Sequence, residues 1–214
     1  MIEFANVTTE YDRERIFRRL HIEPGTHVYD YCVDAFPTLE ETVRRDLRMY
    51  HCYAISQGEF QVGLPEVDQC AYQVVCLSTC TEEILESIDA LLKKGDFLEG
   101  YILNDLCNEI LFNASNQMNR EVDARLRSMG CHLTRRHSPG EGTLAIRYQS
   151  ELLACFRSEP TLAHITLTDT YMLTPEKSML YLYGADPALP WIPVEHDCSR
   201  CPNTTCMFRS VDAG

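Results

Sequence analysis

The chain is short of basic charge. Lys and Arg total 19 against 32 Asp and Glu, which gives a net charge of -13 at pH 7. A surface with this balance repels the phosphate backbone of DNA or RNA, so we expect no nucleic-acid partner. The acidity is explained by solubility or, alternatively, by complementarity to a basic face of a partner protein.

Long apolar runs are also missing. No stretch of about 18 uncharged apolar residues occurs, and the first residues show no apolar run behind a basic start. We therefore expect no membrane partner and a cytoplasmic location. Because thiols stay reduced in that compartment, the eleven cysteines are expected to be buried or to bind metal rather than to form disulfides.

Two glycine motifs and internal repeats are absent as well. The chain contains neither GxGxxG nor the P-loop pattern, and its nearest glycine pair, Gly140 and Gly142, follows a predicted helix rather than a strand. A nucleotide-phosphate site of either kind is therefore not expected.

Helical patterns occupy the first half of the chain. Residues 37–55 open with Thr38 three positions before Glu41, a capping-box spacing, and place Leu39, Val43, Leu47 and Tyr50 on one stripe. A second helix is predicted between Thr81 as its cap and Gly95 as its end, directly after an apolar, β-branched strand at 70–79.

Residues 97–129 contain no proline and carry a broad apolar face, which predicts one long helix or two helices with a break at 112–119. The other face is rich in asparagine, a poor helix former. We expect this face to be solvated, the alternative being that it holds a polar group; it carries Asn104, Asp105, Asn108, Asn116 and Asn119.

The second half of the chain is predicted to contain a loop at 135–143 and strands at 161–168 and 178–184. Strands that do not alternate regularly with helices favour an α+β fold, with a mixed or antiparallel sheet and long helices. We expect one domain at 1–187, followed at 188–214 by a proline-rich arm with a cysteine motif.

The arm ends in a metal-ligand spacing, C-x2-C-x4-C, formed by Cys198, Cys201 and Cys206. A zinc site would take a fourth ligand, for which His196 is the nearest. An iron-sulfur cluster would take a fourth thiolate. The cysteines available for that position are Cys32, Cys52, Cys70, Cys76, Cys80, Cys107, Cys131 and Cys155, each of which is otherwise expected to be a small buried hydrophobe.

Three stretches, 70–110, 135–142 and 167–184, together resemble the reactivation (activation) domain of cobalamin-dependent methionine synthase, and in particular its stand-alone relatives associated with corrinoid methyltransferases. The resemblance covers about residues 15 to 185. It implies an activation-domain-like fold and an S-adenosylmethionine site in an Arg-Pro-x-Pro-Gly-Tyr-Pro loop.

The resemblance maps this loop onto 136–142 and so implies that Arg136, Ser138, Pro139, Gly140 and Glu141 bind the ligand. Arg136 would hold the methionyl carboxylate, unless it is only a surface arginine beside Arg135 and His137. Three positions depart from the family's loop: His137 and Gly142 replace prolines, and Glu141 replaces the tyrosine.

The family's acidic ligand falls near Asn113, so Asp105 and Glu109 are the nearby carboxylates that the resemblance offers instead. Tyr183 belongs to a tyrosine group, with Tyr171 and Tyr181, that would line the ligand site or, more commonly for alternating aromatics, pack in the core.

The implied function is the reductive reactivation of a corrinoid protein or cobalamin-dependent methyltransferase. S-adenosylmethionine would methylate the partner's cobalamin, and an electron donor protein would act with it. A reactivator needs a low-potential electron, which favours iron-sulfur over zinc in the tail. The alternatives are a non-catalytic corrinoid-protein adaptor and a zinc or iron-sulfur module unrelated to cobalamin.

Overall fold

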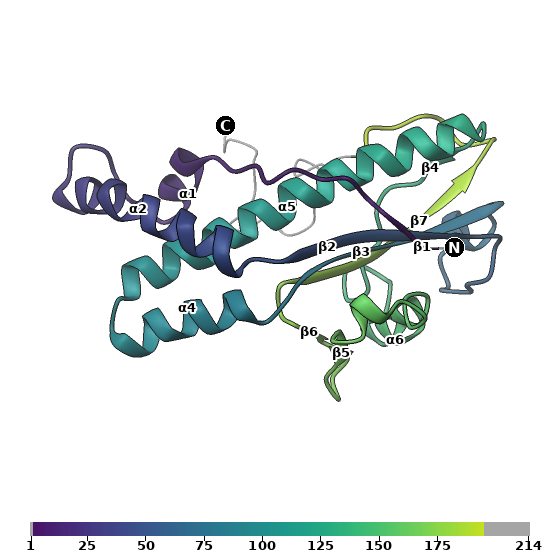
Figure 1. The fold of residues 1–214 in the computed structure, drawn as a ribbon. Helices are drawn as coiled ribbons and strands as arrows, with labels where there is room; N and C mark the ends of the chain where they lie inside the picture. Colours follow the sequence, from purple (N-terminus) through teal and green to yellow (C-terminus); the bar gives the residue numbers. More distant parts are fainter. Residues whose placement is uncertain (1, 195–214) are drawn as a thin grey trace.

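A five-stranded antiparallel sheet forms the centre of the protein. The structure is a computed structural model and describes residues 2–194. The strands lie in the order β1-β2-β3-β7-β4, and each neighbouring pair is antiparallel (Figure 1). Their bounds are β1 Ile2–Phe4, β2 Met49–Ser56, β3 Tyr72–Cys80, β4 His132–Leu133 and β7 Ser178–Asp186. The predicted α+β class and antiparallel sheet are confirmed.

Strand β3 lies at the centre because its side chains are apolar on both faces. Val74 and Cys76 point to one face, and Val75 and Leu77 point to the other. A strand that is buried on both faces reads as a continuous apolar run, which is the pattern that predicted it. β7 pairs with β3 along almost its whole length, from Ser178 opposite Thr79 to Ala185 opposite Tyr72.

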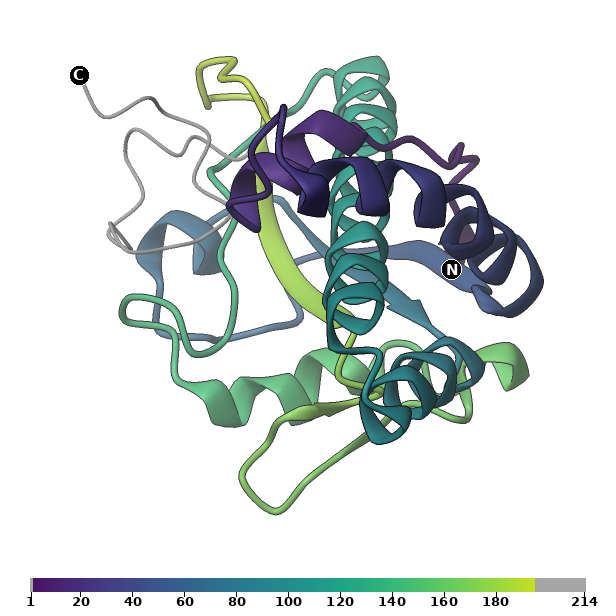
Figure 2. The same ribbon diagram turned by 90° about the vertical axis from the view of Figure 1, so that its left-hand side faces the viewer.

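Helix α5 covers one face of the sheet, and α6 covers the other (Figure 1). Around the first half of α5 gather α1, α2 and α4, as both views show (Figure 2). The helices are α1 Arg13–Arg19, α2 His27–Asp46, α3 Pro65–Asp68, α4 Glu83–Lys94, α5 Phe97–Ser128 and α6 Gln149–Ala154, with short 3-10 turns at Ile146–Tyr148 and Pro160–Leu162.

Helix α2 begins earlier than the sequence pattern predicted. Its cap is Thr26, whose hydroxyl accepts a hydrogen bond from the backbone N–H of Tyr29 at 3.1 Å, and Pro37 lies inside the helix. The predicted cap at Thr38 is therefore wrong, and Tyr50 belongs to β2 rather than to the helix. Burial of the α2 stripe, including Phe36 and Leu39, outweighs the helix-breaking tendency of an internal proline.

The helix predicted to follow Thr81 is confirmed as α4, but its N-cap is Glu82, and the predicted cap at Thr81 is wrong. α4 ends at Gly95, which has the left-handed conformation (φ +95°) that glycine tolerates best. α5 is a single helix of 32 residues and continues through the stretch where a break was an alternative.

The predicted strand at 161–168 is mostly wrong. Only Thr166–Leu167 forms a strand, β5, which pairs with β6 Leu173–Thr174 in a separate two-stranded sheet. Residues Pro160–Leu162 form a 3-10 turn, and Leu162 and Ile165 reach the core from irregular backbone. Apolar composition alone does not make a strand where no neighbouring strand is available for pairing.

The predicted division between 1–187 and 188–214 stays a prediction, because most of the second part lies outside the described residues. Within residues 2–194, no helix has both the length and the apolar content needed to cross a membrane.

Candidate functional site

Residues 134–137 run alongside β7 and fix the direction in which Arg136 points. The backbone N–H of Thr134 donates to Gly184 at 2.9 Å, while His137 and Leu182 exchange two backbone hydrogen bonds of 3.0 and 2.9 Å. Side chains alternate along such an extended segment. Arg135 and His137 accordingly approach Glu66 at 3.7 and 3.9 Å on one side, and Arg136 points to the α5 side.

The guanidinium of Arg136 lies over the ring of Tyr181, with its central carbon 5.0 Å from the ring centroid. This is a cation–π contact, which holds the charge in a fixed position against an apolar surface. Arg136 is half-buried, whereas Arg135 is 78% exposed. The alternative of a plain surface arginine therefore describes Arg135 better than Arg136.

Tyr181 joins the sheet to helix α5. Its hydroxyl donates to the side-chain oxygen of Asn119 at 2.8 Å and lies 2.9 Å from the hydroxyl of Ser115. Its ring packs edge-on against Tyr183, with centroids 5.8 Å apart. Both tyrosines are fully buried and pack against each other, while Tyr171 is 41% exposed.

Two buried polar atoms in this region have no hydrogen-bond partner among the described residues. They are the hydroxyl of Tyr183 and the side-chain nitrogen of Asn119. Burial raises the pKa of Tyr183, so the phenol stays neutral and keeps a proton to donate. Because unpaired buried polar atoms are costly, a water or ligand atom that reached them would be stabilised by pairing with them. We call Arg136, Tyr181, Tyr183, Ser115 and Asn119 the Arg136 cluster.

The loop that follows Arg136 is irregular, as predicted. Pro139 is buried, and Gly140 has φ +91°, a conformation that disfavours other residues. The turn is closed by hydrogen bonds from the N–H of Glu141 to Ser138 and from that of Gly140 to Leu144, at 3.0 and 2.8 Å. Ser138 is half-buried, and Glu141 is exposed.

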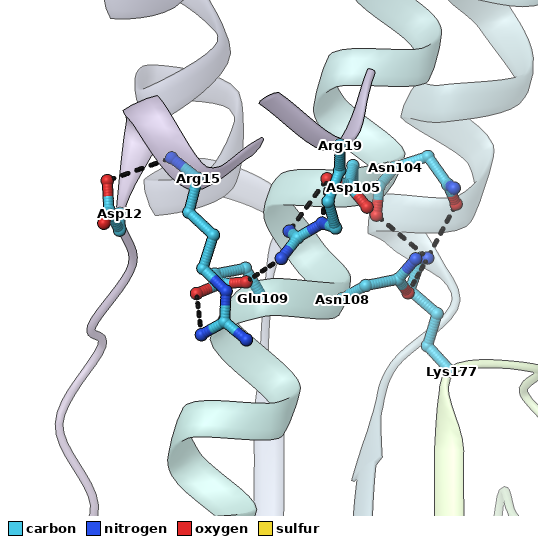
Figure 3. Close-up of polar contacts among 8 residues, drawn as sticks. All are labelled: Asp12, Arg15, Arg19, Asn104, Asp105, Asn108, Glu109 and Lys177. Carbon is cyan, nitrogen blue, oxygen red and sulfur yellow. Dashed lines mark hydrogen bonds and ion pairs between the residues drawn. The ribbon is translucent and has the colours of Figure 1, made fainter. Parts of the chain in front are cut away.

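The structure places Asp105 and Glu109 in a different environment (Figure 3). Both are buried on α5, and the guanidinium of Arg19 from α1 contacts Asp105 at 2.8 and 2.9 Å and Glu109 at 2.6 Å. Arg15 approaches Glu109 at 3.5 Å. Burial raises the pKa of Asp105, and Arg19 opposes that shift. The two carboxylates are thus engaged by α1 and not by the Arg136 loop.

The fold of this chain is similar to that of a solved structure. The crystal structure of the MetH reactivation domain bound to AdoHcy superposes with a TM-score of 0.60, covering 90% of this chain and 81% of that chain at 11% sequence identity. The two folds are alike. No protein-family model matches the sequence, and neither does any curated protein. At 11% identity the match shows the fold.

Lys177 is a buried residue that the sequence reasoning missed. Its ammonium donates to the side-chain oxygens of Asn104 and Asn108, each at 2.7 Å, and to the backbone oxygen of Asn104 at 3.3 Å (Figure 3). Burial lowers its pKa. The spacing of the two asparagines, one helical turn apart on the same face, was the signal that could have indicated a bound cation.

The expectation of a solvated asparagine face is therefore wrong for most of its residues. Asn104 and Asn108 hold Lys177, while Asp105 and Asn119 are buried. Asn113, near which the family's acidic residue falls, donates to the backbone oxygen of Glu10 at 2.9 Å. We call Arg19, Asp105, Glu109, Lys177 and the two asparagines that bind it the Arg19 cluster.

The eight cysteines within residues 2–194 are all free thiols, and seven of them are buried. Burial raises the pKa of all eight thiols, that of Cys107 to about 12, and so keeps them protonated. No group of three or more His, Cys, Asp or Glu side chains in this range is arranged to hold a metal ion. Cys198, Cys201 and Cys206 lie outside the described residues, so the iron-sulfur and zinc alternatives stay predictions.

Proposed function

We propose that this chain binds S-adenosylmethionine at the Arg136 cluster and supports the reductive reactivation of a corrinoid protein. The observation that carries the proposal is the shared fold with the MetH reactivation domain bound to AdoHcy, over 90% of the chain. AdoHcy is what remains of S-adenosylmethionine once its methyl group has been transferred. The predicted loop begins at a segment paired with β7, the strand that carries Tyr181 and Tyr183, which supports the same reading.

The residues present fit the carboxylate end of such a ligand. A guanidinium fixed over the Tyr181 ring can hold a carboxylate through two parallel hydrogen bonds. The neutral hydroxyl of Tyr183 and the side-chain nitrogen of Asn119 are donors that lack an acceptor among the described residues. Ser138, Pro139, Gly140 and Glu141 would line the approach to this point, with Gly140 allowing the backbone to come close.

The carboxylates fit less directly. Asp105 and Glu109 face the cation of Arg19, so an ammonium or sulfonium group of the ligand would have to compete with that guanidinium. We therefore propose that Arg136 and its loop supply the affinity, and that Asp105 and Glu109 act on the ligand only through the position of α5.

The chemistry would be divided between the chain and its partners. Bound S-adenosylmethionine would supply a methyl group to the reduced cobalt of the partner's corrinoid, leaving S-adenosylhomocysteine, and an electron donor protein would supply the electron for the preceding cobalt reduction. The residues of this chain would bind and orient the methyl donor, since positioning accounts for much of the rate of such transfers.

Titration calorimetry with S-adenosylmethionine and S-adenosylhomocysteine tests the ligand. We expect Arg136→Gln to weaken binding at least tenfold, because a charge-assisted pair contributes about 1.5–3 kcal/mol. The matched control is Arg135→Gln, which changes the neighbouring exposed arginine and should leave the affinity within about twofold.

Three results would count against the ligand assignment: no saturable binding by the unmodified protein, an Arg136→Gln variant that binds normally, or equal losses in both variants. Absence of S-adenosylmethionine binding together with binding to a corrinoid protein would instead favour the non-catalytic adaptor. Failure to bind either would favour a module unrelated to cobalamin.

For the tail, we propose that Cys198, Cys201 and Cys206 bind a metal centre, preferably an iron-sulfur cluster that relays an electron. Protein purified without oxygen should then contain iron and sulfide, and the triple variant Cys198→Ser, Cys201→Ser, Cys206→Ser should lose both. Cys155→Ser, which alters the one half-buried cysteine outside the motif, serves as the control. Stoichiometric zinc in place of iron would make the centre structural.

A further inference from the structure

A cleft separate from the Arg136 cluster opens between α4 and the segment that leads into β7. Its volume is about 670 Å³, within the range of roughly 300–1,000 Å³ typical of small-molecule sites. It is lined by the first turns of α4, by residues on both sides of β6 and by Gln149 at the start of α6. None of the loop residues from Arg136 to Glu141 lines it.

The rim of this cleft is acidic. Glu82, Glu86 and Asp89 lie on successive turns at the start of α4, and Glu176 faces them from the segment before β7. All four are exposed, and no Lys, Arg or His is among the residues that line the cleft. Lys93 contacts Asp89 from outside the cleft, at 3.4 Å. The field at the entrance therefore attracts a cation.

The lining of the cleft includes a buried hydrogen-bond acceptor without a partner among the described residues. Gln149 is 7% exposed, and its side-chain oxygen is buried without a hydrogen-bond partner among the described residues. Most buried polar atoms in proteins have a hydrogen-bond partner, so an unpaired buried oxygen is uncommon. A ligand N–H that enters the cleft would supply this donor.

The remaining surface is apolar. Leu85 and Ile88 contribute from α4, and Met172, Leu173 and Pro175 contribute from the opposite wall. Met172 is 54% exposed, so its side chain is accessible to a ligand in the cleft. The apolar walls match a hydrocarbon body rather than a fully hydrated ion.

We propose that this cleft binds a small organic amine, with its protonated nitrogen donating to Gln149 and its apolar body against Leu85 and Met172. The acidic rim supplies attraction at a distance, the buried oxygen fixes the nitrogen, and the walls select a ligand that carries a hydrocarbon group. This inference concerns a second site and does not rest on the proposed function.

Protein labelled with ¹³C at the methionine methyl groups provides a local readout, because Met172 is the methionine that lines the cleft. The probe is 2-phenylethylammonium, compared with neutral 2-phenylethanol of the same shape. We expect the ammonium compound to shift the Met172 resonance saturably at millimolar concentration or below, and the alcohol to bind at least fivefold more weakly.

Two variants separate the parts of the site. Gln149→Leu keeps the size of the side chain but removes the acceptor, and should weaken the probe about tenfold. The double variant Glu82→Gln, Glu86→Gln should weaken it about threefold and reduce its dependence on salt. Glu151→Gln, an exposed change on α6 outside the cleft, should have no effect.

The proposal is overturned if the Met172 resonance does not move, if the alcohol binds as well as the amine, or if Gln149→Leu binds normally. It is also overturned if a basic peptide binds at the cleft and the small amine does not, since the site would then be a protein-docking surface. Displacement of the probe by S-adenosylmethionine would show that the cleft is not a second site.

Discussion

The two polar clusters along α5 differ in how their groups are satisfied. In the Arg19 cluster, Asp105 and Glu109 share the guanidinium of Arg19, and Lys177 has three oxygen acceptors. In the Arg136 cluster, Tyr183 and Asn119 each retain an atom without a partner among the described residues. The comparison teaches that buried charge by itself does not mark a ligand site, since the more highly charged cluster is the one closed by the chain's own contacts.

The largest expected effect comes from opening the Arg19 cluster. Arg19→Met leaves the buried Asp105 without its cation and Glu109 with only the 3.5 Å contact of Arg15, and should lower the free energy of unfolding by about 3–5 kcal/mol. Urea denaturation measures the loss. Arg18→Met, which changes an exposed neighbour on the same helix, should cost less than about 0.5 kcal/mol. A loss below about 1 kcal/mol in the Arg19 variant would show that the buried carboxylates do not depend on their ion pairs with Arg19.

The second prediction concerns the pH dependence of stability and His51. This residue lies on β2 opposite Ser78 of β3, and β3 in turn pairs with β7, the strand that carries Tyr181. His51 is 3% exposed, its Nδ1 lies 2.9 Å from the hydroxyl of Ser78, and burial lowers its pKa from 6.5 to about 4. Between these values the unfolded chain binds more protons than the folded one. Stability should therefore rise with pH across this window, and acidification should remove about 3 kcal/mol of it.

The measurement is the difference in unfolding free energy between the unmodified protein and His51→Gln at several pH values, because other groups titrate in both proteins. The difference should be constant above about pH 7 and should shift in favour of the variant as the pH falls toward about 4. A difference that does not change with pH would contradict a neutral buried His51.

The smallest effects distinguish the two tyrosines of the Arg136 cluster. Tyr181→Phe removes the donor to Asn119 and should destabilise the protein by about 1–2 kcal/mol. Tyr183→Phe removes a buried hydroxyl that has no partner among the described residues, so it removes an unpaired polar group and should not lower stability. Thermal and urea unfolding of the two variants decide this. Equal losses would mean that the Tyr183 hydroxyl is satisfied after all.

Patterns that are local in the sequence predicted helices and strands well. The apolar run of β3, the alternation in β7, the glycine at the end of α4 and the long proline-free stretch of α5 all gave elements that the structure contains. Each of these signals depends on a few neighbouring residues and on the period of a helix or strand. The start of α2 was missed because tertiary burial of its stripe tolerates Pro37.

The site was predicted only in part, because its key contacts join distant segments. Arg19 is 86 positions from Asp105 and 90 from Glu109, and nothing near those carboxylates in the sequence indicates which cation they meet. Likewise, Lys177 reaches Asn104 across 73 positions. The position of Arg136 beside Tyr181 depends on the backbone pairing of His137 with Leu182, which the loop composition does not reveal.

A crystal structure of the chain with S-adenosylhomocysteine tests the central claim most directly. The account predicts ligand density beside β7, with its carboxylate on Arg136 and the Tyr183 hydroxyl or the Asn119 side-chain nitrogen within hydrogen-bond distance. Density elsewhere on the protein, or a ligand that contacts neither Arg136 nor either of the two unpaired atoms, would contradict it.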